Sequence, residues 1–208
     1  VRKYVPEPKR MVVMTDNDQM PSMGEDVTYR LLDTTVNAPG WWAKMNMFRP
    51  GAWNGKALYM DLDTVLIGDL SALTSLTPDP LVMLDDRNVP GLPNGSVMLF
   101  EAERVRGIWG SYAFDPRQTE RHYVVRGDDY SRAYDQAYVA QWVKDVTGNA
   151  PPFFQEMLPL GYCLNAYSEL PRTDDWRSAH LIYGCGGSKE GKPHTASHQV
   201  FADNWATS

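Results

Sequence analysis

Short apolar runs recur along the whole chain, separated by turns rich in glycine, proline and polar residues. Residues 10–15 and 27–32 have the length and the apolar content of strands. Further strands are predicted on the same grounds at residues 57–61, 64–67, 81–84, 96–100 and 180–183. The pattern therefore predicts a sheet built from several short strands.

Residues 41–48 have a helical period instead of the alternation of a strand. Trp41, Met45 and Phe48 recur at helical spacing, and Pro50 ends the segment. Because aromatic side chains pack most often in a core, we expect Trp41 and Phe48 to face the interior.

A second helix is predicted after Ser131, which is a suitable N-cap residue. One face of this helix carries Asp135, Val139, Trp142 and Val146. Asp135 is thereby placed in the first turn, in line with an otherwise apolar stripe.

Length and composition fit one domain over residues 1–208, closed by a short helix at 201–205. The mixture of strands and helices predicts the α/β class. The net charge of -6 and the pI near 5.2 argue against nucleic acid or an anionic membrane as the main partner, because both require a basic surface. Cys163 and Cys185 are too few for a disulfide framework and favour a reducing, cytoplasmic compartment. No apolar run approaches the ~18 residues of a membrane-spanning helix, so no transmembrane segment is expected.

Asp61 and Asp63 interrupt the apolar tract that runs from residue 58 to residue 70. Carboxylates are seldom buried unless they are paired or bound to a cation. In an extended segment, side chains two residues apart point to the same side, roughly 6 to 7 Å apart at Cα. The pair therefore predicts a site for a hard divalent cation that also holds a phosphorylated substrate.

A glycine-rich segment at residues 184–194 contains Gly186, Gly187 and two lysines, one of which is Lys192. Backbone N–H groups and ammonium charges of such a loop can wrap a pyrophosphate, although a solvated basic loop fits the spacing equally well. A nucleotide-binding P-loop is rejected, because position 193 is Pro where Ser or Thr is needed for magnesium.

The aspartate pair also fits a phosphohydrolase of the haloacid-dehalogenase type, with Asp61 as nucleophile and Asp63 as acid and base. That family requires a Thr four residues after the first Asp, where this chain has Val65. We keep this hypothesis as an alternative.

Taken in order, the motifs of this chain resemble those of GT-A-fold glycosyltransferases. The resemblance is to the retaining group that includes glycogenin and bacterial lipopolysaccharide galactosyltransferases, especially small bacterial or phage-type members. The matching segments are residues 12–16, 40–48, 58–65, 93–98, 135–136 and 192–194. The resemblance implies a mixed, mostly parallel central sheet flanked by helices, and implies that the first strand of the fold would precede residue 1.

The resemblance also implies a nucleotide-sugar donor, UDP-sugar above all, whose pyrophosphate binds Mn²⁺ or Mg²⁺. Asp61 and Asp63 would hold the metal, and Lys192 with Gly186 and Gly187 would bind the diphosphate. The family usually has a metal-binding His just before its Lys-Pro dipeptide, where this chain has none. His194 is assigned as its substitute, with His180 as the other choice.

The remaining implied roles concern the transferred sugar. Asp135 and Gln136 match the Asp-Gln pair beside the anomeric carbon, Asn94 matches a residue near the sugar pocket, and Lys44 stands where the family also has Lys. Because the Gln136 amide is a poor nucleophile, front-face substitution with retention is expected, with an unidentified hydroxyl acceptor. The alternative from another class is a non-catalytic GT-A-like module that binds a nucleotide or a glycan.

Overall fold

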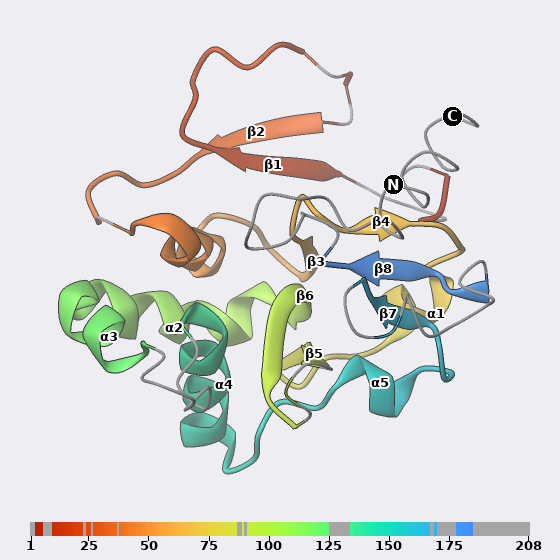
Figure 1. Cartoon of the computed structure of the whole chain (residues 1–208). Helices are drawn as coiled ribbons and strands as arrows, with labels where there is room; N and C mark the ends of the chain where they lie inside the picture. The colour runs from red at the N-terminus through yellow and green to blue at the C-terminus, as the bar shows by residue number, and fades with distance from the viewer. Residues whose placement is uncertain are drawn as a thin grey trace.

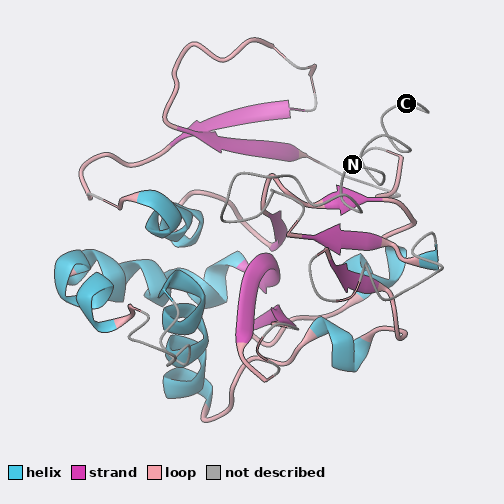
Figure 2. Cartoon of the chain, in the orientation of Figure 1, coloured by secondary structure: helices cyan, strands magenta, loops and turns pink. Residues whose placement is uncertain are grey.

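The computed structural model describes residues 3–5, 10–22, 24–25, 27–36, 38–86, 89, 91–124, 134–166, 169 and 178–184. This part of the chain contains both strands and helices, as Figures 1 and 2 show, so the predicted α/β class is confirmed. The elements are β1 (Met11–Thr15), β2 (Val27–Leu31), the 3₁₀ helix η1 (Gly40–Phe48), β3 (Lys56–Met60), β4 (Val65–Leu66), α1 (Ser71–Ser75), β5 (Leu81–Asp85), β6 (Pro93–Glu101), α2 (Ala102–Phe114), α3 (Pro116–His122), α4 (Tyr134–Thr147), α5 (Phe154–Met157), β7 (Cys163–Asn165) and β8 (Leu181–Tyr183).

The described strands form three small sheets, and their pairing is not mostly parallel as predicted. β1 pairs with β2 in parallel, β6 lies between β3 and β5 and is antiparallel to both, and β8 is antiparallel to β4 but parallel to β7. The connection from β5 to β6 spans only residues 86–92. A parallel crossover needs a dozen or more residues, so this connection can join only antiparallel strands.

The central β3–β6–β5 sheet is buried on both faces because successive side chains of a strand point to opposite sides. In β5, Met83 packs toward η1, α2 and α4, whereas Val82 packs toward α1, α5, β7 and β8. In β6, Met98 and Leu99 divide between the two clusters in the same way. Figure 1 shows these two groups of elements on opposite sides of the sheet.

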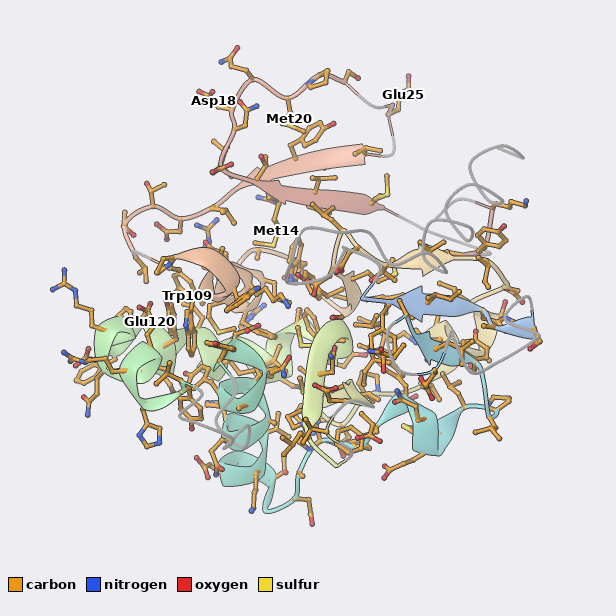
Figure 3. All side chains as sticks on the ribbon, in the orientation of Figure 1. Met14, Asp18, Met20, Glu25, Trp109 and Glu120 are labelled. Atoms are coloured by element: carbon orange, nitrogen blue, oxygen red, sulfur yellow. The ribbon has the colours of Figure 1, made fainter. Side chains whose placement is uncertain are left out.

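The β1–β2 pair lies at one edge of the molecule. Met14 of β1 points toward the interior, where it packs against the cluster formed with η1 and α2, while Asp18, Met20 and Glu25 lie on the outer loop before β2 (Figure 3).

The segment predicted as a helix over residues 41–48 is the 3₁₀ helix η1. Trp42 and residues 45–48 are all buried, so burial in η1 is not confined to one face. Trp41, in the first turn, is 60% exposed. The predicted burial of Trp41 is therefore wrong.

Helix α4 begins at Tyr134, and the predicted cap Ser131 lies outside the described residues. Asp135 is in the first turn and buried together with Val139, as predicted. Val146 is exposed, because the last turn of α4 extends beyond the packed core and residues 144–150 are all exposed. Among the described residues, no helix has the length and apolarity needed to cross a bilayer. The helix predicted at 201–205 also lies outside them.

Candidate active site

Lys44 of η1 joins two carboxylates that are far apart in the sequence. Its Nζ lies 3.0 Å from Asp61 Oδ2 and 3.6 Å from Asp135 Oδ2. The same ammonium donates a hydrogen bond of 3.4 Å to the carbonyl oxygen of Gly95. Only 14% of the Lys44 side chain and 6% of the Asp135 side chain are exposed. Segments predicted separately from the sequence thus meet around one buried ammonium group.

Asp61 and Asp63 lie on a turn and not on the extended segment assumed from the sequence. The Asp61 N–H donates to Ser96 O at 2.8 Å, which is where the pairing of β3 with β6 ends. The Thr64 N–H donates to Asp61 O at 3.2 Å and closes the turn. Leu62 at its tip is 99% exposed, so the apolar tract opens to solvent between the two carboxylates.

The Asp61 carboxylate has a second partner that the sequence analysis missed. The Tyr59 hydroxyl donates to Asp61 Oδ1, while Lys44 occupies Oδ2. Tyr59 lies near the end of β3 and Asp61 directly follows that strand, so a tyrosine two residues before the aspartate was a usable signal. Both oxygens of Asp61 are therefore oriented by hydrogen-bond donors.

Gly95 of β6 brings the start of α4 against the sheet. Its N–H donates to Gln136 Oε1 at 3.3 Å. A Cβ atom at this position would lie 3.3 Å from Gln136 Cβ and 3.8 Å from Asp135 Oδ2, which leaves little space for a side chain. Asn94 precedes it within β6, and its Oδ1 accepts from the Ser96 N–H at 2.9 Å. Asn94 therefore lies beside the Lys44 cluster, and Gly95 is a second site residue that the sequence analysis missed.

The charges around Lys44 determine the protonation of the cluster. Burial lowers the pKa of Lys44, but the carboxylates of Asp135 and Asp61 outweigh burial, so the pKa is raised overall and the ammonium form is retained. Burial raises the pKa of Asp135; Lys44 opposes that shift, and the negative charge of Asp61 adds to it. Burial, followed by the charge of Asp61, raises the pKa of Tyr59, so its hydroxyl stays neutral and donates. One ammonium thus serves two carboxylates.

The turn carries oxygen ligands of the kind that a hard divalent cation prefers. Asp61 and Asp63 supply carboxylate oxygens, and Mg²⁺ is often held by one or two carboxylates together with substrate phosphates. The buried Thr64 Oγ1 next to them has no hydrogen-bond partner within the described ranges. No group of three or more His, Cys, Asp or Glu residues that could hold a metal is found in that part of the chain. The two aspartates fit a metal that is also bound by its substrate.

His180, considered as a further metal ligand, has a structural environment of its own. Its ring stacks on Tyr162 with centroids 4.2 Å apart, and its Nδ1 is hydrogen-bonded to Asp69 O. The predicted residues Gly186, Gly187, Lys192 and His194 lie outside the described residues, and their roles stay predictions.

The comparisons with known proteins find a similar fold in solved glycosyltransferase structures. No family model matches the sequence, and no curated protein matches it. Among solved structures, the glycosyltransferase GlyE of Streptococcus pneumoniae TIGR4 superposes with a TM-score of 0.56 at 12% identity, over 88% of this chain and 50% of GlyE. An active-site mutant of LgtC, in which glutamine is replaced by glutamate, superposes with a TM-score of 0.50 at 12% identity, over 86% of this chain and 76% of LgtC.

This chain spans half the length of GlyE. At such identities the comparison shows the fold, and function has to be argued from the site. The predicted GT-A-like glycosyltransferase fold is confirmed.

Proposed function

We propose that this protein is a metal-dependent glycosyltransferase that moves a sugar from a nucleoside diphosphate sugar to a hydroxyl acceptor with retention. UDP is the expected nucleotide. The observation that carries the proposal is the contact of Lys44 with both Asp61 and Asp135, in a chain with a glycosyltransferase fold. This contact brings a candidate diphosphate site and a candidate sugar site together at one ammonium group.

Asp61 and Asp63 would hold Mn²⁺ or Mg²⁺, which when bound neutralises the diphosphate and acts as a Lewis acid. Tyr59 and Lys44 fix the orientation of the Asp61 carboxylate, so little reorganisation is needed when the donor binds. In this proposal Lys192 adds positive charge beside the departing diphosphate.

Asp135 and Gln136 would bind the transferred sugar. Asp135 is buried and held by Lys44, which leaves its carboxylate suited to accept hydrogen bonds from sugar hydroxyls. Gln136 Oε1 accepts from the Gly95 N–H, and in this proposal the amide nitrogen of Gln136 donates to the substrate. The active-site mutant of LgtC supports a glutamine in an active site of this fold.

The chemistry of Gln136 favours front-face substitution. An amide is a poor nucleophile, and the Asp135 carboxylate is paired with an ammonium. The acceptor oxygen would form its bond to the anomeric carbon on the face from which the diphosphate leaves, and the leaving phosphate oxygen would take the acceptor proton. Configuration at the anomeric carbon is then retained without a glycosyl-enzyme.

The proposal is tested by release of UDP from a panel of UDP-sugars with Mn²⁺. Wild type is compared with Asp63→Ala and with Asp18→Ala, a control on the exposed loop before β2. Release by wild type and the control, abolished by chelation and by Asp63→Ala, supports the proposal. Equal background release by all three proteins refutes it.

The alternatives predict different results. If the protein is a non-catalytic module, UDP and Mn²⁺ raise its unfolding midpoint, but it releases no UDP from UDP-sugars. A phosphohydrolase releases phosphate from a simple monoester without a nucleotide-sugar. The structure disfavours the phosphohydrolase, because a carboxylate with a hydrogen bond to each oxygen from Lys44 and Tyr59 is a weakened nucleophile.

A further inference from the structure

Trp41 is a large aromatic side chain that the fold leaves in solvent. It is 60% exposed, whereas its neighbour Trp42 is 6% exposed and stacks on Tyr112 with ring centroids 5.4 Å apart. The exposure of Trp41 is therefore specific to that side chain and does not reflect loose packing of η1. Its ring contacts Tyr134, with centroids 4.6 Å apart and planes inclined by 47°.

This aromatic pair lies directly beside the candidate sugar site. Trp41 and Lys44 are three residues apart in a 3₁₀ helix and so share a face. Tyr134 immediately precedes Asp135 at the start of α4. Two neighbouring contacts thus link η1 to α4. One is the aromatic pair Trp41–Tyr134, and the other is the ion pair Lys44–Asp135.

The backbone of Tyr134 is held in an unusual conformation. Its φ of 55° lies in the left-handed region, which side chains other than those of Gly, Asn and Asp seldom adopt. The structure keeps the ring beside Trp41 in spite of this strain, and such outliers cluster at ligand sites.

We propose that Trp41 and Tyr134 form an aromatic platform that binds a pyranose ring of the acceptor, so that the acceptor is itself a sugar. The inference rests on the proposed function, which it extends to the substrate class. A pyranose has an apolar C–H face and a rim of hydroxyls. An exposed indole can pack against the apolar face, and a neighbouring carboxylate and amide can form hydrogen bonds with the hydroxyls.

The position of the platform assigns it to the acceptor and not to the nucleobase of the donor. The candidate diphosphate ligand Asp61 and the candidate sugar ligand Asp135 both contact the Lys44 ammonium. The platform adjoins Asp135, which in the proposed function binds the transferred sugar close to its anomeric carbon. A ring bound there is placed to present its hydroxyl to that carbon.

Binding is measured by saturation-transfer NMR with methyl α- and β-glycosides of glucose, galactose and N-acetylglucosamine, in the presence of UDP and Mg²⁺. The proteins are wild type, Trp41→Ala, Trp41→Phe and Phe114→Ala, a matched control in which an aromatic residue that is 92% exposed at the end of α2 is removed. Thermal unfolding confirms that each variant is folded.

We expect transfer to the sugar ring protons with wild type, Trp41→Phe and Phe114→Ala, and its loss with Trp41→Ala. In turnover assays, Trp41→Ala is expected to raise the acceptor KM about tenfold while kcat changes less, because stacking contributes mainly to binding. An absence of saturation with wild type, or equal saturation with Trp41→Ala, overturns the proposal. So does an equal loss of UDP affinity, which would assign the platform to the nucleotide.

The binding measurement does not depend on catalysis. If wild type releases no UDP from any UDP-sugar, the proposed transferase activity fails, while saturation transfer still decides whether the platform binds a sugar.

Discussion

Lys44 Nζ and Asp135 Oδ2 face each other at 3.6 Å across the contact between η1 and α4, and both side chains are largely buried. The same ammonium lies 3.0 Å from Asp61 Oδ2. A single positive charge therefore holds the end of β3, the strand β6 and the start of α4 against η1. The stability of this region and the geometry of the candidate site depend on the same residue.

Replacing Lys44 by Met is expected to destabilise the protein by about 3–5 kcal/mol, because it leaves buried carboxylates without their counter-charge. Urea unfolding monitored by tryptophan fluorescence measures the change. Lys144→Met, which removes an exposed lysine near the end of α4, is the matched control and should change stability by less than about 0.5 kcal/mol.

The double variant Lys44→Met/Asp135→Asn tests the cause of that loss. Removing the Asp135 charge as well should restore part of the stability, so the two effects are not additive. A double variant whose loss equals the sum of the single losses would show that the two groups do not interact.

Gly95→Ala is expected to reduce turnover about tenfold or more with a change in stability of only about 1 kcal/mol. The added methyl group would stand 3.3 Å from Gln136 Cβ, so the first turn of α4 must move by a few tenths of an ångström. Steady-state kinetics and urea unfolding separate the two effects. Turnover equal to that of wild type would show that the position of Gln136 is not important for catalysis.

Much of the fold followed from local patterns. The strands predicted at 10–15, 27–32, 81–84 and 96–100 correspond to β1, β2, β5 and β6. Pairing direction was predicted wrongly, because it depends on connection lengths and on which strands meet in space. The burial of Trp41 was predicted wrongly because aromatic character alone does not determine which side chains of a short helix reach the core.

The candidate site was predicted in part. Asp61, Lys44 and Asp135 were chosen from motifs, and the structure brings them into contact. Tyr59 was missed because a tyrosine in an apolar strand resembles a core residue until its partner is known. The importance of Gly95 was hidden because its neighbours Gln136 and Asp135 come from a distant helix.

Two glycines of α2 should respond in opposite ways to replacement by alanine. At Gly110 a Cβ atom meets nothing within 4 Å, so Gly110→Ala should stabilise the protein by about 0.5–1 kcal/mol through helix propensity. At Gly107 the Cβ atom would lie 2.5 Å from Trp142 Cζ2, so Gly107→Ala should destabilise it by about 1–3 kcal/mol. Urea midpoints of the two variants decide the matter, and stabilisation by both would contradict the packing of α2 on α4.

The lowered pKa of Asp33 predicts how the stability of the protein changes at acid pH. Its carboxylate accepts hydrogen bonds from the Thr35 hydroxyl and the Thr35 N–H, which, with a smaller contribution from Arg49, lower the pKa of Asp33 below its ordinary value of 3.8. Because the pKa is lower in the folded state, the ionised carboxylate stabilises the fold at any pH above the pKa of the unfolded state. This contribution is lost as the pH falls through the pKa of the folded state.

Asp33→Asn should therefore be less stable than wild type near about pH 7, and the difference should shrink as the pH falls below about 3.8. Urea unfolding across this range, in moderate salt, measures the difference. Asp18→Asn on the exposed outer loop is the control and should track wild type within about 0.5 kcal/mol throughout. A difference for Asp33→Asn that stays constant or widens toward acid pH would show that the Asp33 charge does not stabilise the fold.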